Sequence, residues 1–169
     1  MAFGCTTTAW SQKPLAFREY DLPNGLHVIL HEDHSAPVVA TVVHYKVGSR
    51  DEDPARTGFA HFFEHMQFQG SDHVADEQHF KIVSDAGGTM NGTTNSDRTN
   101  YFETMPSNYL ETALWLESDR MLELDFSQKS LDVQKSVVIE EFKQRYLNRP
   151  YGDAHLILRD LHFTTHPYR

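Results

Sequence analysis

Hydrophobic and polar residues follow two different periods along the chain, which predicts both strands and helices. The β-rich segments His27–His31 ("HVILH") and Val38–Val47 ("VVATVVHYKV") predict two antiparallel strands, after an extended lead-in over Lys13–Tyr20. The threonine-rich and aromatic segment Thr89–Met105 ("TMNGTTNSDRTNYFETM") predicts a strand, a turn and a second strand that ends at Pro106.

Five segments carry apolar residues at helical spacing or lie between helix start and stop signals. The predicted helices cover Gly58–Phe68, Glu77–Ala86, Asn108–Glu123, Leu131–Tyr146 and Asp153–Phe163. We expect Gly70 to end the first helix, and Asp76 and Ser107 to cap the second and third.

The order of hairpins and helices predicts an α+β fold, with a two-layer antiparallel sheet and helices packed on one face. We expect a flexible N-terminal segment over residues 1–16 and one domain over residues 17–169. No strand follows the last helix to return the chain to the sheet. The sequence therefore predicts a domain that is incomplete at its C-terminal side.

Composition supports a globular domain: 39% of the 169 residues are hydrophobic and 12% are aromatic. The formal net charge is −9, with both signs interspersed, which argues against nucleic acid as the main partner. A single cysteine, Cys5, excludes an intramolecular disulfide and a cysteine-rich zinc module. Any metal would therefore be held by histidine and carboxylate groups. No apolar run is long enough for a membrane span.

The N-terminus has one feature that bears on location. Gly4 and Cys5, followed by small polar residues, resemble the tail of a bacterial lipoprotein signal. This favours the bacterial periplasm or cell envelope. An ordinary flexible N-terminus, with an organellar or cytoplasmic location, is the alternative.

The first predicted helix contains two histidines and a glutamate: His61, Glu64 and His65. Residues four apart lie on one helix face, so both imidazoles can reach one metal ion while Glu64 lies beside it. A catalytic zinc usually has three protein ligands, and Glu140 or Glu141 on a later helix could be the third. The alternative is a partly exposed helix that is merely rich in histidine.

The stretch "GFAHFFEHMQFQGS" contains the inverted zinc motif H-x-x-E-H and closely resembles the motif region of insulinase/pitrilysin-type peptidases, the inverzincins. This group includes the mitochondrial processing peptidase. "GGTMNGTTNSDRTNYFETMP", "VVIEEFKQRYLNRP" and "HPYR" resemble further family segments in the same order. The similarity runs from about Tyr20 to the end of the chain.

The resemblance assigns roles to individual residues. It implies that His61 and His65 are zinc ligands, that Glu64 is the general base, and that Glu141 is the third ligand. Glu140 then becomes a neighbour of the site. The family often has a supporting acid seven residues before the third ligand, where this chain has Gln134, so the charge behind the ligands differs.

The resemblance also implies a substrate-binding edge. In the family, the strand after the Gly-Gly segment pairs with the substrate backbone, and here this strand contains Asn91, Gly92, Thr93 and Thr94. Gly92 stands where alanine is usual. Phe68 would line the pocket just past the cleaved bond, and the alternative for this ring is an ordinary core position. For "MNGTT", the alternative to a binding edge is a plain hairpin turn.

These roles imply a zinc-dependent endopeptidase that uses a zinc-bound water and Glu64 as general base. Family members close two homologous halves around a peptide or protein substrate, so we expect a second homologous domain or subunit as partner. Two alternatives remain. One is a non-catalytic or half-site subunit, and the other is a metal-dependent hydrolase or lyase acting on a non-peptide bond.

Overall fold

The structure is a computed structural model that describes residues 14–169. Cys5 and most of the predicted flexible segment 1–16 lie outside these residues. The chain divides into two compact units between Pro37 and Val38. Each unit is described separately below.

The first unit contains an antiparallel hairpin of β1 (Arg18–Asp21) and β2 (His27–Leu30). Its turn uses Gly25 at φ 87°, a left-handed conformation that favours glycine. The sequence predicted that the strand at His27–His31 would pair with the strand at Val38–Val47. That prediction was wrong, because β2 takes β1 as its partner, a strand that the sequence suggested only as an extended lead-in.

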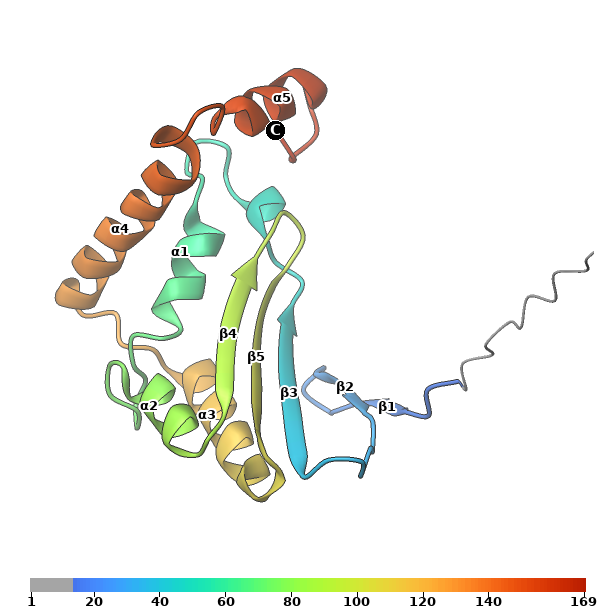
Figure 1. Ribbon diagram of the computed structural model, residues 1–169. Coiled ribbons are helices and arrows are strands. Elements are labelled where there is room, and N and C mark those ends of the chain that lie inside the picture. The colour runs from blue at the N-terminus through green and yellow to red at the C-terminus, as the bar shows by residue number, and fades with distance from the viewer. Residues whose placement is uncertain (1–13) are drawn as a thin grey trace, which may run out of the picture. The chain divides into compact units, whose positions relative to one another are not determined.

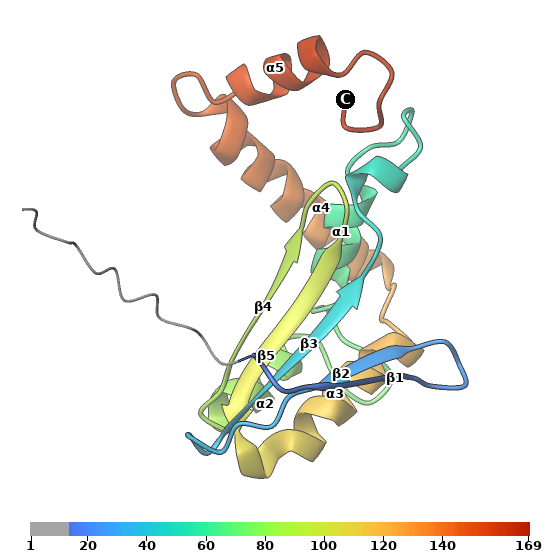
Figure 2. The same cartoon turned by 90° about the vertical axis from the view of Figure 1, so that its right-hand side faces the viewer.

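The second unit is built on a three-stranded antiparallel sheet. Its strands are β3 (Val38–Tyr45), β4 (Thr89–Thr94) and β5 (Thr99–Pro106), in the order β3-β5-β4. Burial alternates along β5, so one face of the sheet is covered and the other is open. Figure 2 shows the three strands side by side. The predicted strand, turn and strand that end at Pro106 are confirmed.

Helices account for most of the remaining second unit (Figure 1). They are η1 (Ser49–Asp51), α1 (Phe59–Met66), α2 (Gln78–Asp85), η2 (Ser107–Tyr109), α3 (Leu110–Leu122), α4 (Gln128–Phe142), the π-helical η3 (Lys143–Leu147) and α5 (Ala154–His162). All five predicted helices are present, with ends shifted by a few residues. None of the helices among residues 14–169 has the length and apolar character to span a membrane.

Three predicted helix caps are wrong. Helix α1 ends at Met66 with Gln67 as its C-cap, rather than at Gly70. The N-cap of α2 is Glu77 at φ 64°, with no side-chain cap bond, rather than Asp76. Ser107 begins a 3-10 turn, η2, that leads into α3 without a capping bond. By contrast, Ser127 does cap α4, because its Oγ accepts a hydrogen bond from the Ser130 amide at 3.2 Å. Local cap signals predicted the presence of these helices better than their first residues.

The apolar core lies between the covered sheet face and helices α2 and α3. Its buried members are Val74, Val83, Met105, Ala113 and Leu116. This arrangement, together with helices on one face of an antiparallel sheet, confirms the predicted α+β class.

A buried polar network continues the core towards α1. The Glu117 carboxylate accepts hydrogen bonds from the Arg120 guanidinium, and His79 Nε2 lies 2.6 Å from Glu103 Oε1. The guanidinium carbon of Arg120 lies 4.3 Å from the centre of the Tyr101 ring. Burying these charges is tolerable because each has an opposite or hydrogen-bonding partner.

Candidate metal centre

Helix α1 carries His61, Glu64 and His65. Its position is fixed by one buried face and by contacts at its N-terminus. Met66 is fully buried on the core side. At the N-terminus, the Glu52 carboxylate accepts hydrogen bonds from the amides of Gly58 and Ala60, both at 2.7 Å. These amides belong to the helix turn whose N–H groups have no partner within the helix. Glu52 thus replaces a conventional cap, and no local sequence pattern indicates this role.

The structure brings together the three residues predicted as metal ligands. His61 Nε2 and His65 Nε2 are 3.3 Å apart. Glu141 Oε2 from α4 lies 3.5 Å from His61 Nε2 and 3.6 Å from His65 Nε2. The three residues are separated by up to eighty positions in the chain, and the packing of α4 against α1 makes them neighbours.

These separations fit a tetrahedral zinc ion. Zinc binds imidazole nitrogen and carboxylate oxygen at roughly 2.0–2.2 Å, so two ligand atoms on a tetrahedron are roughly 3.3–3.6 Å apart. The three observed distances, 3.3, 3.5 and 3.6 Å, agree with that spacing. Two neutral nitrogens and one carboxylate are also a donor set that zinc prefers. The residues present therefore fit the zinc ion that the sequence predicts.

The sequence left Glu140 and Glu141 as alternatives for the third ligand, before the resemblance favoured Glu141. In the structure, Glu141 faces the imidazoles, whereas the Glu140 carboxylate lies 3.3 Å from Lys143 Nζ on the exposed side of α4. Consecutive helix residues are rotated by about 100°, so the two side chains cannot share a face. Glu140 therefore makes no contact with the three-residue cluster among the recorded interactions of residues 14–169.

The environment of His61 favours its neutral imidazole. Burial, and then the neighbouring His65 ring, lowers the pKa of His61 below its ordinary value, against the opposing effect of Glu64 and Glu141. A metal binds the neutral form of histidine. The lowered pKa of His61 therefore keeps this nitrogen available to a metal at neutral pH.

Gln134 supports the second histidine. Its Oε1 lies 3.1 Å from His65 Nδ1, so it accepts a hydrogen bond when that nitrogen carries the proton. This tautomer leaves His65 Nε2 free to bind a metal. Gln134 is 9% exposed, so water cannot easily replace it. The glutamine thus keeps the acceptor that a carboxylate would supply, but without the negative charge.

We expect Gln134→Ala to weaken zinc binding about 10- to 100-fold, because His65 loses the acceptor that fixes its tautomer and ring orientation. Chelator competition with a zinc indicator measures this change. Gln128→Ala on the same helix is the matched control, since the Gln128 amide bonds only to Asp132 among the recorded contacts of residues 14–169. Equal zinc affinity for the two variants would contradict the supporting role of Gln134.

Glu64 is placed beside the cluster without belonging to it. Its buried Oε2 has no hydrogen-bond partner within residues 14–169. A buried carboxylate oxygen without a partner is costly, so such an atom at a metal centre points to an interaction with a group that binds there. A Cβ atom added at Gly92 would lie 3.2 Å from Glu64 Oε1. Glu64 therefore lies between the imidazoles of α1 and strand β4.

The predicted substrate-binding residues lie along β4, which is an edge strand of the sheet in the described part of the chain. Asn91 and Thr93 are exposed and Thr94 is half-buried, whereas Gly92 is buried against α1. An edge strand offers unpaired backbone groups that can bind an extended peptide. Strand β4 thus pairs with β5 in the predicted hairpin and leaves its other side as the predicted binding edge.

Phe68 lies next to this edge and not in the apolar core. Its ring centre is 5.0 Å from that of Phe80 and 5.6 Å from that of Tyr101, and the Arg120 guanidinium carbon lies 5.5 Å from it. A Cβ added at Gly92 would lie 3.2 Å from Phe68 Cε2. The ring therefore forms an apolar wall beside Gly92 and Glu64.

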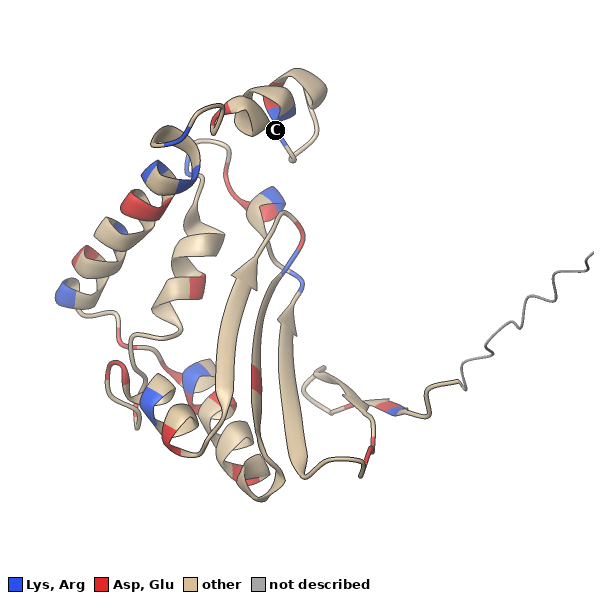
Figure 3. Ribbon diagram, in the orientation of Figure 1, with Lys and Arg blue, Asp and Glu red and all other residues tan. Residues whose placement is uncertain are grey.

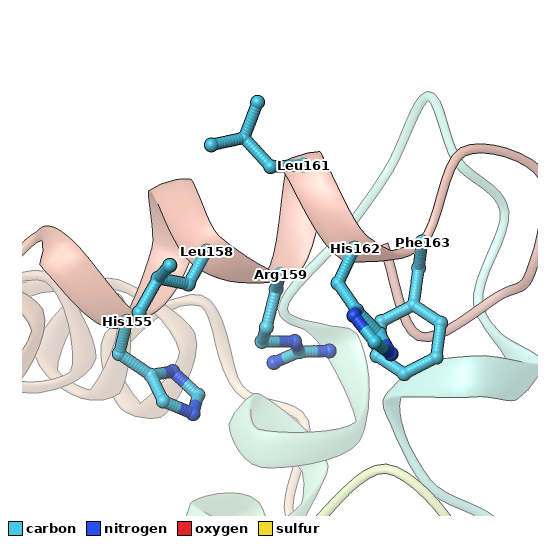
Figure 4. Close-up of a pocket in the computed structure, with 6 residues that line it drawn as sticks. All are labelled: His155, Leu158, Arg159, Leu161, His162 and Phe163. Carbon is cyan, nitrogen blue, oxygen red and sulfur yellow. The ribbon is translucent and has the colours of Figure 1, made fainter.

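Two cavities of the second unit lie away from the metal cluster. One, of about 410 Å³, is lined by α5 residues and Phe163 (Figure 4). The other, of about 360 Å³, lies on the side of α1 that carries Phe59 and Phe63. Neither is lined by His61, His65 or Glu141. The candidate site therefore lies apart from both cavities, and its three ligand residues are half-buried.

Comparison with known proteins identifies a family. Residues 27–165 match the family model described as "Insulinase (Peptidase family M16)". The zinc protease PqqE of Helicobacter pylori is 32% identical over 148 residues, which are 87% of this chain and 33% of that protein. The probable mitochondrial-processing peptidase subunit beta of Arabidopsis thaliana is 29% identical over 73% of this chain and 23% of its own length.

Solved structures of peptidases have a similar fold. The crystal structure of a protease from Helicobacter pylori matches with a TM-score of 0.86 and 30% identity, over 91% of this chain and 37% of that one. Pitrilysin matches in fold with a TM-score of 0.72 at 24% identity, over 79% of this chain and 14% of that one. This chain thus spans about a third or less of the length of these proteins. The family model covers most of the chain, and the chain therefore belongs to the insulinase family of peptidases, family M16.

Proposed function

We propose that this chain is the metal-binding half of a zinc-dependent endopeptidase. One observation carries the proposal. Three donor atoms, His61 Nε2, His65 Nε2 and Glu141 Oε2, are spaced as on a zinc tetrahedron, beside the unpartnered carboxylate oxygen of Glu64. Relatives named as zinc proteases support the same assignment.

When bound, zinc would supply Lewis-acid chemistry, polarising a peptide carbonyl and making a water molecule more acidic. His61, His65 and Glu141 would hold it, and Gln134 would keep His65 in the required tautomer. Glu64 would accept a proton from the attacking water at its carboxylate and later return it to the amine that leaves. The Glu64 carboxylate is suited to this exchange because it is half-buried and has an oxygen without a partner.

The substrate would be an extended peptide that adds to the free edge of β4. Its backbone would pair with residues 91–94, and one of its side chains would point inwards past Gly92 towards Phe68. Because Gly92 closely approaches Glu64, a peptide backbone paired with β4 would lie beside the proposed base. This arrangement favours a peptide bond over a small non-peptide substrate.

We propose further that efficient cleavage needs a second homologous half, in the same protein or in a partner subunit. The chain spans about a third of the relatives' length, and His61 keeps 33% of its side-chain surface exposed. An open site binds an extended peptide weakly, because water is not excluded. The three proposed ligands and the proposed general base speak against a purely non-catalytic subunit, the second candidate.

A zinc-dependence experiment tests the proposal. The purified chain is stripped with a chelator, reloaded with zinc, and assayed with internally quenched peptides, with and without an added second half from a relative. We expect one zinc per chain and cleavage that requires the metal. Metal-independent cleavage would overturn the mechanism. Zinc binding without cleavage in either condition would favour the half-site subunit that does not catalyse.

A further inference from the structure

An arginine at the turn between β4 and β5 lies beside the proposed substrate edge. Arg98 ends this turn, and its Nη1 donates hydrogen bonds to Thr93 Oγ1 at 2.8 Å and to Asn100 Oδ1. Thr93 and Asn100 are register partners across β4 and β5. The guanidinium of Arg98 is therefore held at the C-terminal end of the edge strand β4, beside Thr93, the residue after Gly92.

The charge of Arg98 has no acidic partner within residues 14–169, because both of its recorded bonds go to neutral oxygens. The adjacent Asp97 does not neutralise it. Asp97 Oδ1 accepts hydrogen bonds from Arg50 Nη1 at 2.7 Å and from the Tyr168 hydroxyl at 2.6 Å. Figure 3 shows that both charge signs occur at this turn. Arg98 is also half-buried, which reduces screening by water.

Strand geometry decides which substrate side chain can reach this charge. Successive residues of a strand point to opposite faces of the sheet. Gly92 lies on the face covered by α1, and its register partner Tyr101 is buried there, whereas Thr93 is exposed on the opposite face. A peptide residue placed opposite Thr93 therefore projects to the open face, next to the residue that points at Glu64.

Directly opposite residues have Cβ atoms about 4.5–5.5 Å apart, and the Arg98 guanidinium is already bonded to the Thr93 side chain. A carboxylate opposite Thr93 would thus lie within reach of it. Only Nη1 of Arg98 is used in the recorded bonds of residues 14–169, which leaves the Nε and Nη2 N–H groups for a carboxylate.

We propose that Arg98 is a specificity-determining residue that selects an acidic side chain at the substrate position opposite Thr93. This inference rests on the proposed function, because it places a peptide on β4. The inference adds a side-chain preference at one position of the peptide, next to the peptide residue that faces Glu64. A glutamine or a lysine at that position is bound less tightly than a glutamate or an aspartate.

Peptide binding tests this preference without requiring cleavage. Fluorescent peptides of otherwise uncharged sequence carry a single glutamate, glutamine or lysine that is moved one position at a time. Anisotropy measures their binding to the zinc-loaded Glu64→Gln protein, which leaves the peptides intact. We expect one position at which glutamate binds about fivefold more tightly than glutamine, with the neighbouring positions insensitive.

Variants of Arg98 identify the cause. In the same background, Arg98→Gln should abolish the preference, and Arg98→Glu should transfer it to lysine at the same position. Arg56→Gln is the matched control, because Arg56 is exposed in the loop before α1 and its removal changes the net charge equally. The preference should persist in that control and weaken as salt is raised.

The outcomes separate this inference from the proposed function. A flat glutamate scan, or a preference that survives Arg98→Gln, overturns the role of Arg98 even when the wild-type protein cleaves peptides. The expected preference, together with wild-type protein that cleaves neither alone nor with an added second half, supports Arg98 and overturns the peptidase function. Absence of peptide binding at every position, also when the second half is added, overturns both.

Discussion

Replacing Glu64 with glutamine is expected to lower peptide hydrolysis by at least about a thousandfold while zinc binding stays unchanged. Glutamine keeps the size of the side chain but cannot accept the proton from water. The metal should remain, because Glu64 lies beside the three donor atoms and is not one of them. Initial rates on a quenched peptide and the zinc content of the same samples measure the two quantities.

The matched control for this substitution is Glu111→Gln, which removes one carboxylate from the exposed surface of α3. Its activity and zinc content should equal those of the wild type. If Glu64→Gln retained more than about a tenth of the activity, general-base catalysis by this residue would be excluded. If it lost its zinc, Glu64 would have to be reassigned as a ligand.

The substitution Glu141→Gln is expected to weaken zinc binding by at least about a hundredfold, because it replaces the charged ligand of the site with a neutral amide. Loss of the metal should also abolish metal-dependent activity. The unfolding temperature of the metal-free protein should change little, since the Glu141 side chain is 42% exposed. Chelator competition gives the affinity, and thermal unfolding with and without zinc gives the stabilisation by the metal.

The adjacent Glu140→Gln is a stringent control for this experiment. It removes the same charge from the same helix, but from a carboxylate that pairs with Lys143 at the surface. An exposed pair of this kind contributes at most about 1 kcal/mol, and zinc affinity should be retained. If Glu140→Gln weakened zinc binding as much as Glu141→Gln did, the assignment of the third ligand would be wrong.

Periodicity along the chain predicted the helices and the β4–β5 hairpin, because each depends on contacts between residues close in sequence. The pairing of strands was harder to predict from the sequence. The β2 strand was expected to pair with the next strand, whereas it pairs with β1, whose four residues are all exposed and carry no clear alternation of polar and apolar side chains. Helix caps were also missed, since the α1 N-terminus is satisfied by Glu52 from a preceding loop.

The candidate site shows the same limit. The spacing of His61, Glu64 and His65 is local, so the helix pattern alone predicted that they share one side of α1. Residues alone could not choose between Glu140 and Glu141, because that choice depends on how α4 packs against α1. The resemblance to a known family supplied the choice. No sequence signal indicated Arg120 or Arg98, whose contacts join residues on different elements.

The buried ion pair behind Phe68 has a consequence for the range of substrates. Arg120 is 2% exposed and its guanidinium lies under the rings of Phe68 and Tyr101, bound to the Glu117 carboxylate. Moving it would leave one charge of the pair uncompensated, at a cost of about 3–5 kcal/mol. On the proposed function, a peptide side chain that entered beside Phe68 would therefore meet a rigid wall, and we expect a bulky one to be rejected.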